Sequence, residues 1–474
     1  MEELQTLLFI NNEFVESSEK ELHALQNPFD ESVVTDQVHF AAPADVDRAV
    51  AGALAAFNSG LWNSFTGPQR ARCLYEFANL AEKEAARLAR IESLATGRPI
   101  GGLQFFEIAH MVETIRYYAG WADKIAGESF IDDDGLYKIV QYEPIGVCAG
   151  IASWNATFMY FIFKSSEKSP LGALALGPLF IKAGFPPGVV QILSGAGDTG
   201  AALASHPHIS KISFTGSATV GRMVQDAATR SNLKRVTLEL GGKSPAIVFP
   251  DAPMDIAIAN VGSGFLANSG QICVAASRVL VHASIATSFV GKLKSLFEEA
   301  ASKLGSDPLE VQTDHGPVAD LQQYQRIMTY IEQGKKDASL VTGGSRKGDK
   351  GFFICPTLFL DPPEDSSIWR EEIFGPVLCV KTFQTEEEAI HLANNTDYGL
   401  SSCIYTTDVT RALRLAGKLE SGTVSVNTPH LPSRNTPLGG KKQSGYGREL
   451  GKHGLMSYLE AKTIHINMNV PSKL

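Results

Sequence analysis

Residues 211–221 read KISFTGSATVG, an apolar strand-like run that passes through a glycine turn into a segment of helical composition. A strand that leads directly into a helix places free backbone N–H groups and the positive end of the helix dipole at one edge of a sheet, where an anion can bind. The stretch therefore predicts a β-strand, turn and α-helix unit with a phosphate-binding turn.

The same alternation of strand-like and helix-like segments continues on both sides of this unit. Short apolar runs at 147–151, 161–163 and 189–193 are separated by glycine-rich turns and helix-length segments, and a second stretch of this kind runs from 239 to about 430. Alternating strand and helix patterns are typical of parallel sheets covered by helices, so the predicted fold class is α/β. The motif G-x-G-x-x-G at 195–200 has no convincing acidic residue about 20 positions further on, which favours plain turn glycines over a dinucleotide fingerprint.

Composition narrows the functional classes. The chain has 474 residues, 44% of them hydrophobic, and its 42 basic and 51 acidic residues give a net charge of −9. This length suggests several domain-sized units, and the acidic balance argues against a nucleic-acid-binding or basic membrane-surface protein. The six cysteines form no CxxC pair and none adjoins a histidine, so we predict neither a disulfide scaffold nor a metal site.

Three segments bear on location. The uncharged run 145–163 contains Ser153, Asn155 and Thr157, so we interpret it as a buried strand and a polar loop, with no membrane partner. The first residues lack the basic and apolar regions of a secretory leader. The last three, Ser472-Lys473-Leu474, match the peroxisomal import tripeptide, so the predicted location is cytoplasmic or peroxisomal.

Two residues are candidates for chemistry. Cys273 lies among small residues in NSGQICVAA, where a lone cysteine is usually inert packing. Glu239 lies between Leu238 and Leu240 and precedes two glycines, and burial there would raise its pKa toward that of a useful general base. The alternative for Glu239 is an ion pair with Lys243.

These two segments resemble the glutamate and cysteine signatures of the aldehyde dehydrogenase superfamily. Three further motifs occur in the family's order over nearly the whole chain: EPIGV at 143–147 followed by Trp154-Asn155, EEIFGPV at 371–377, and PLGGK at 437–441 followed by SGYGRE at 444–449. The resemblance implies a Rossmann-like nucleotide-binding domain (1–122 and 144–238), a second α/β catalytic domain (239–455) and a small β oligomerisation arm (123–143 and 456–474). It also implies a homodimer or homotetramer, with 137–142 and 462–469 pairing between subunits as edge strands.

The resemblance further implies an NAD-dependent oxidation of an aldehyde to the carboxylic acid. Cys273 would attack the aldehyde carbon, the Asn155 amide and the Cys273 N–H would bind the oxyanion, and Glu239 would activate water to hydrolyse the thioester. Because acyl-CoA-forming relatives typically lack this base, we favour hydrolysis over a CoA-acylating reaction. The mouth of the substrate-binding site would be lined by residues near Phe158, Tyr160, Ile272, Val274 and 430–436. This mix of aromatic and aliphatic side chains favours an apolar or aromatic aldehyde.

For the cofactor, the resemblance assigns Lys164 and Glu167 to the adenosine ribose. A carboxylate at 167 repels a 2′-phosphate, so we predict NAD over NADP. Glu372 would hold the nicotinamide ribose and Phe374 would pack near the ring; the alternatives are a solvated helix acid and a core residue. The remaining predicted cofactor contacts, three of them near the pyrophosphate, are Trp154, Phe214, Gly216, Ser217, Gly221 and Leu240.

One segment departs from the family pattern. After Trp154-Asn155 the family usually continues with Phe-Pro and a helix, whereas here Ala156-Thr157 follow and the chain reaches Lys164 almost at once. Compared with the family pattern, about fourteen residues are missing between Phe161 and Ile162. The residues that remain are fewer than a parallel crossover connection needs. Either the region rearranges and displaces Lys164 and Glu167, or the chain is a shortened gene product, which we favour. We expect reduced stability, and a catalytically silent binding or structural protein is the alternative function.

Overall fold

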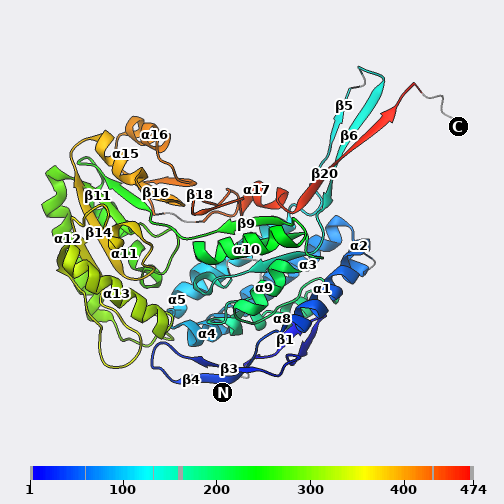
Figure 1. Ribbon diagram of the computed structural model, residues 1–474, viewed down its shortest axis with the longest axis horizontal. Helices are drawn as coiled ribbons and strands as arrows, with labels where there is room; N and C mark the ends of the chain where they lie inside the picture. Colours follow the sequence, from blue (N-terminus) through cyan, green and yellow to red (C-terminus); the bar gives the residue numbers. More distant parts are fainter. Residues whose placement is uncertain (1–3, 59, 132, 159–163, 430–431, 470–474) are drawn as a thin grey trace.

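The structure is a computed structural model that describes residues 4–58, 60–131, 133–158, 164–429 and 432–469. Two lobes lie side by side, and a narrow β arm projects from one of them (Figure 1). The chain begins with two hairpins, β1 (Leu8–Ile10) with β2 (Glu13–Val15) and β3 (Leu22–Gln26) with β4 (Val33–His39). Helices α1 (Pro43–Asn58) and α2 (Leu61–Ser64) follow.

The next helices form one side of the first lobe. Its two longest helices are separated at Glu84, and the second of them ends where Gly97 takes a left-handed conformation with φ +67°. A capping box between Thr66 and Gln69 starts the first of them. In order, these helices are α3 (Gly67–Lys83), α4 (Ala85–Thr96), α5 (Ile100–Gly102), the π-helical turn η1 (Leu103–Ile108) and α6 (Ala109–Ala119).

The core of the first lobe is a four-stranded sheet in the order β19-β9-β8-β7. Strands β7 (Cys148–Ile151), β8 (Lys211–Thr215) and β9 (Arg235–Glu239) are parallel, as predicted, and β19 (Gly445–Tyr446) pairs antiparallel with β9. Helices α9 (Gly197–Ser205) and α10 (Ala218–Ser231) pack on this sheet, whose apolar residues form one of the buried clusters. The short elements η2 (Trp154–Ala156), α7 (Pro170–Leu174) and α8 (Gly177–Lys182) lie between β7 and α9 in the sequence.

The second lobe is built on a seven-stranded sheet in the order β12-β13-β14-β11-β10-β16-β17, parallel except for β12 with β13. Alternate residues of the central strands enter two different cores: Ile247 and Leu280 belong to one cluster, Val248 and Val279 to the other. Such burial on both faces is typical of parallel strands covered by helices. The strands are β10 (Pro245–Val248), β11 (Arg278–His282), β12 (Ser339–Thr342), β13 (Thr357–Leu360), β14 (Val377–Phe383), β16 (Ser401–Tyr405) and β17 (Thr423–Val426).

Helices and short turns cover this sheet on both faces (Figure 1). They are α11 (Met254–Leu266), η3 (Ala267–Gly270), η4 (Ala283–Ile285), α12 (Ala286–Lys303), α13 (Leu321–Asp337), α14 (Ser367–Arg370), α15 (Glu386–Asn394) and α16 (Val409–Ala416). A two-stranded ribbon of β15 (Tyr398–Gly399) and β18 (Lys441–Lys442), followed by α17 (Gly451–Met456), leads the chain back to the first lobe.

The arm is a three-stranded antiparallel sheet in the order β20-β6-β5. Strand β6 (Leu136–Pro144) pairs with β20 (Leu459–Asn467) along its whole length and with β5 (Glu128–Phe130) on its other side. The prediction that 137–142 and 462–469 are both edge strands that pair between subunits is therefore wrong for the first of them: β6 is the central strand, and only β20 and β5 have free edges. No described helix is long and apolar enough to cross a membrane.

Candidate active site

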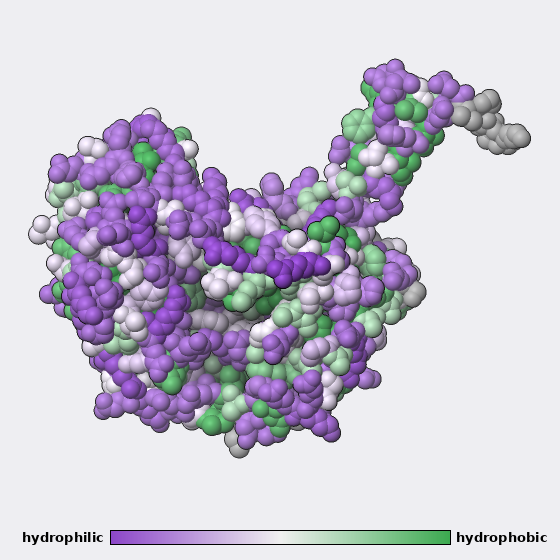
Figure 2. All heavy atoms as spheres, viewed as in Figure 1, coloured by the Kyte–Doolittle hydropathy of each residue, from purple (hydrophilic) through white to green (hydrophobic). Residues whose placement is uncertain are grey.

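A cleft of about 630 Å³ opens at the carboxyl ends of the parallel strands β7, β8 and β9, between the two lobes. Figure 2 shows this face of the molecule hollowed between the lobes. Strand ends at such an edge carry the loops that bind ligands in α/β proteins. The predicted site residues that line the cleft are Trp154, Asn155, Lys164, Glu167, Phe214, Gly216, Ser217, Glu239, Leu240, Cys273, Glu372 and Phe374.

Gly221 is the predicted residue that does not line the cleft. It lies one turn inside α10, where its N–H donates to the Ser217 carbonyl at 2.9 Å. A Cβ at this position would lie 2.6 Å from Leu240 Cδ2. The glycine therefore allows α10 to pack closely on the chain after β9, and it faces away from the predicted pyrophosphate.

The end of the cleft near α10 fits an anionic, partly apolar ligand. Ser217 caps α10 by accepting a hydrogen bond from the Val220 N–H at 3.3 Å, and the helix N-terminus faces the cleft with Gly216 beside it. Val220 and Met223, on the cleft side of α10, are exposed although they are apolar. An adenine or another flat apolar group would cover them, while the helix end suits a phosphate.

Lys164 and Glu167 lie at this same end of the cleft. Lys164 is buried, and burial lowers the pKa of its ammonium to about 8 while the nearby Glu167 favours the charged form. Its Nζ donates to the Ser165 carbonyl at 3.0 Å. A buried cation and a carboxylate side by side can hold the hydroxyl groups of a ribose.

Cys273 follows a segment of strained backbone and packs against Gly242 of the turn after β9. Asn268 and Ser269, just before it, adopt positive φ values of +49° and +54°, and such strain is common at functional sites. A Cβ on Gly242 would lie 2.4 Å from the Cys273 carbonyl oxygen. Gly242 thus lets the turn after β9 approach the cysteine loop. Burial, then the charges of Glu372 and Glu239, raise the pKa of the Cys273 thiol to about 12.

Glu239 has only 4% of its surface exposed, and its Oε1 has no hydrogen-bond partner among the described residues. Burial, reinforced by the charge of Glu449, raises its pKa well above the ordinary value. The alternative of an ion pair with Lys243 is not seen, because the Lys243 Nζ also has no partner among the residues described. An unpartnered buried carboxyl group beside a thiol is suited to accept a proton from water.

The Asn155 amide points toward the cysteine loop. Its Nδ2 donates to the Gln271 carbonyl at 3.0 Å, and its Oδ1 accepts from the Ser153 hydroxyl at 2.8 Å. Because an amide NH₂ has two hydrogens, one N–H is left to donate to another acceptor. Asn155 and Cys273 therefore border the same part of the cleft with a free donor available.

Glu372 and Phe374 reach the cleft from the second lobe. Glu372 Oε1 accepts from the Gly242 N–H at 2.9 Å, and burial raises its pKa to about 7, so it is not the solvated helix acid of the alternative interpretation. Phe374, with φ +62°, stands edge-on to Trp154 at a centroid distance of 5.5 Å. Its ring lines the cleft and is not a core residue.

Several cleft residues were missed by the sequence analysis. Arg326 of α13 donates to the Glu372 carbonyl at 2.7 Å, and Lys168 lies 5.4 Å from the centre of the Trp154 ring. Both belong to amphipathic or loop segments without a local motif. Gly197 and Gly200, interpreted as turn glycines, also line the cleft because α9 begins at the first of them.

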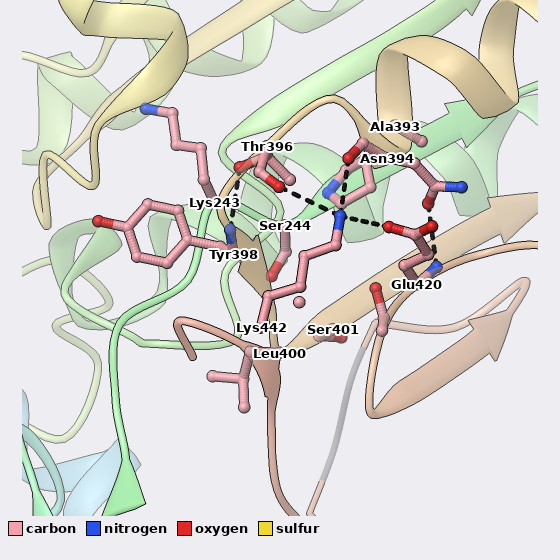
Figure 3. A pocket seen from close by; sticks show the side chains of 13 residues that line it. Lys243, Ser244, Ala393, Asn394, Thr396, Tyr398, Leu400, Ser401, Glu420 and Lys442 are labelled. Atoms are coloured by element: carbon pink, nitrogen blue, oxygen red, sulfur yellow. Dashed lines mark hydrogen bonds and ion pairs between the residues drawn. The ribbon is translucent and has the colours of Figure 1, made fainter. Parts of the chain in front are cut away.

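A second hollow, of about 10 Å³, lies between the start of β10, the end of α15 and the β15–β18 ribbon, and it holds at most one water molecule (Figure 3). The Lys442 ammonium donates to the Asn394 carbonyl at 2.8 Å and pairs with Glu420 at 2.5 Å. Close by, the Ser444 hydroxyl donates to the Gly241 carbonyl at 2.7 Å. The Lys442 contacts fix the late glycine-rich loop against the end of α15 and the segment before β17, and the Ser444 contact fixes it against the turn after β9. A hollow of this size is too small to bind substrate. Among the described residues, no cluster of His, Cys, Asp or Glu is placed to hold a metal ion.

The shortened segment does not displace the predicted cofactor residues. Lys164 forms parallel bridges with Ile151 and Leu193, and its N–H donates to the Gly150 carbonyl at 2.9 Å, so it keeps a strand position beside β7. Lys164 and Glu167 both line the cleft, and their contact with a ribose stays a prediction. Phe158, predicted at the mouth, is 1% exposed and lies in the core. Tyr160, the gap between Phe161 and Ile162, and residues 430–431 lie outside the described residues.

Comparison with known proteins agrees with this geometry. The family model of the aldehyde dehydrogenase family matches residues 14–464. Human retinaldehyde dehydrogenase 3 is 43% identical over 98% of this chain and 93% of its own length, and an aldehyde dehydrogenase of Davidiella tassiana is 45% identical over 98% and 96%. The NAD⁺ complex of aldehyde dehydrogenase from Bacillus cereus superposes with a TM-score of 0.94 at 38% identity, covering 99% of this chain and 97% of that one.

Proposed function

Since the chain belongs to the aldehyde dehydrogenase family and oxidises an aldehyde to the carboxylic acid with a nicotinamide dinucleotide as hydride acceptor, we propose that Cys273 is its nucleophile, Asn155 its oxyanion donor and Glu239 its hydrolytic base. The observation that carries this proposal is the convergence of these three side chains on one cleft. They come from η2 after β7, from the end of β9 and from the loop after η3, which are separate segments of the sequence.

The first step forms a bond between Cys273 Sγ and the aldehyde carbon, and the carbonyl π electrons move to oxygen. The spare Asn155 N–H and the Cys273 backbone N–H donate to this oxyanion, which stabilises the thiohemiacetal. Because only the thiolate attacks well, the raised pKa of Cys273 means that the thiol must pass its proton to solvent water as it attacks. A nicotinamide held beside this carbon would supply the hydride acceptor, and loss of hydride from the thiohemiacetal would leave a thioester on Cys273.

The second step releases the acid. Glu239 removes a proton from a water molecule, the water oxygen bonds to the thioester carbon, and the C–S bond breaks to return the Cys273 thiolate. The raised pKa of Glu239 makes it a stronger base than an exposed carboxylate once it is ionised. This base also favours hydrolysis over transfer of the acyl group to coenzyme A.

The cofactor that the site suits better is NAD. The residues that would hold it are Lys164 and Glu167 at the ribose, Ser217 at the pyrophosphate, and Glu372 with Phe374 at the nicotinamide end. Glu167 supports the preference, because its carboxylate would repel the 2′-phosphate of NADP. We propose the same three-way division for the chain: 1–122 and 144–238 would bind most of the cofactor, 239–455 would supply Cys273, and 123–143 with 456–474 would form the oligomerisation arm.

The substrate we propose is an apolar or aromatic aldehyde. Ile272 and Val274 flank the nucleophile, and the names of relatives such as retinaldehyde dehydrogenase 3 and the indole-3-acetaldehyde dehydrogenase of P. syringae support this class.

Assembly into a homodimer or homotetramer is proposed through the free edges of β20 and β5 in the arm, because an unpaired strand edge can pair with a second chain.

Aldehyde-dependent NADH formation tests the catalytic assignment. We expect Cys273→Ala to abolish it, whereas Cys355→Ala, a matched change at another partly buried cysteine, should leave it intact. Undiminished oxidation by Cys273→Ala would contradict the proposal. Measuring turnover with and without coenzyme A distinguishes hydrolysis of the thioester from transfer of its acyl group to coenzyme A. Hydrolysis by water requires no coenzyme A.

A further inference from the structure

Two buried carboxyl groups lie directly beneath the loop that carries Asn155. Glu92 of α4 has none of its surface exposed, and Glu107 of η1 has 2%. Neither lines the cleft, so neither can touch the substrate. Buried acids are costly unless hydrogen bonds or a counter-charge compensate them, which makes their partners informative.

Each carboxyl group contacts one of the two residues that follow η2. The Thr157 hydroxyl lies 2.6 Å from Glu92 Oε1 and 2.9 Å from Ser169 Oγ. The Phe158 N–H donates to Glu107 Oε1 at 2.8 Å. Arg98, at the end of α4, donates to the second oxygen of Glu107. The loop is thus tied to α4 and η1 immediately after Asn155.

Close packing keeps this network in place. A Cβ on Gly172 of α7 would lie 2.3 Å from Glu92 Oε2 and 2.9 Å from Phe158 Cζ. The glycine at 172 therefore leaves just enough room for both side chains, and neither can shift toward α7. Desolvation raises the pKa of Glu92 to about 8, with Arg98 and Glu107 as the charged groups that face it.

The loop has few other supports. Among its described residues, 152–158, the only regular structure is the single turn η2. Within the described part of the chain, the Asn155 side chain forms hydrogen bonds only with Ser153 and Gln271. The contacts of Thr157 and Phe158 are therefore what connects this loop to the helices of the first lobe.

We propose that Glu92 and Glu107 are positioning residues for the oxyanion donor: through Thr157 and Phe158 they hold the shortened loop so that the Asn155 amide faces Cys273. This inference rests on the proposed function. A displacement of about 1 Å in a catalytic group can lower the rate about a hundredfold. Loosening the loop should therefore reduce turnover while the cleft that binds the cofactor stays intact.

Thr157→Val is the sharpest test, because it removes the hydroxyl and keeps the volume. Thr114→Val is the matched control, since Thr114 is also buried in the first lobe but its hydroxyl has no partner among the residues described. We expect Thr157→Val to lower kcat roughly tenfold to a hundredfold with little change in KM or in the Kd of NAD. We expect Thr114→Val to match the wild type.

Glu92→Leu and Glu92→Gln form a second pair, in which the glutamine keeps an oxygen that accepts from Thr157. Leucine should reproduce the kcat loss and glutamine should restore most of it. In every variant, iodoacetamide should alkylate Cys273 at the wild-type rate. A kcat that falls no further in Thr157→Val and Glu92→Leu than in Thr114→Val would overturn the inference, as would a loss that glutamine does not rescue.

Hydrogen exchange of the peptide covering 152–158 gives a readout independent of turnover. Glu107→Leu removes the acceptor of the Phe158 N–H, so exchange there should speed up about tenfold relative to Thr114→Val. Unchanged exchange would refute the positioning role. If the wild-type chain oxidised no aldehyde but the peptide responded as expected, the proposed function would fail while the support of the loop by these acids would stand.

Discussion

Replacing Glu239 by glutamine separates the two halves of the proposed reaction. The side chain is almost fully buried, and its Oε1 has no partner among the described residues, so the amide should fit in the same space. Attack and hydride loss depend on Cys273 and Asn155, which the change leaves in place. Hydrolysis depends on proton removal from water, which an amide cannot perform.

The expected size of the effect follows from the role. Loss of a general base slows a step about 10²–10⁴-fold, or about 3–5 kcal/mol of activation free energy. Attack should not slow, because the Glu239 charge raises the pKa of Cys273 and its removal makes the thiolate easier to form. Glu239→Gln should therefore release close to one NADH per active site in a fast first turnover and then continue slowly.

Stopped-flow absorbance of NADH measures both phases, and trapping the acyl-enzyme by intact mass identifies the stalled thioester. Glu387→Gln, at an exposed acid of α15, is the control and should behave as the wild type. A steady-state rate near that of the wild type would refute the role of Glu239 as base. Loss of the first turnover together with the second would instead assign Glu239 to an earlier step.

The other predictions concern acidity, cofactor choice and stability. Turnover should rise with pH as Glu239 ionises at its raised pKa, and this rise should be absent from the slow phase of Glu239→Gln in a pH–rate profile. Glu167→Gln should bind NAD more weakly and discriminate less against NADP, measured as the ratio of kcat/KM for the two cofactors. Because the pKa of Glu92 rises from 4.5 to about 8 on folding, its contribution to the free energy of unfolding is complete below pH 4.5 and is lost as pH rises toward 8. Denaturant melts at several pH values should show that Glu92→Gln removes this fall in stability. A version with the missing segment restored should unfold at a higher temperature than this chain.

The parallel sheet and the residues at its strand ends were predictable, because each depends on a local pattern. Strand, turn and helix follow one another at 211–221, and parallel strands bring their carboxyl ends to one edge, so Ser217 and Glu239 had to lie near each other. Arg326 carried no such signal. It lies on an amphipathic helix of the other lobe and reaches the cleft only because the two lobes meet there.

The errors have equally specific causes. Phe158 follows the catalytic loop, and sequence position alone does not tell whether an apolar ring lines a mouth or fills a core; Gly172 leaves the space that takes it into the core. Gly221 lies four residues after Ser217, one helical turn inside α10. It packs against Leu240 there and does not line the cleft. Strand β6 has the alternation of an edge strand, yet its partner β20 comes from the same chain and makes it central.

The shortened crossover changes what the fold must do to keep Asn155 in place. The connection between two parallel strands normally contains a dozen or more residues, usually as a helix that packs on the sheet and orients the loop after the first strand. Here Lys164 bonds directly to the backbone beside β7, so the strand register is kept where the connection ends. Backbone pairing fixes the two ends of the connection but not the side chain of Asn155 between them. That task falls to hydrogen bonds from Thr157 and Phe158 to buried acids of α4 and η1. Activity in this chain should therefore depend on Glu92 and Glu107, two residues that never meet the substrate.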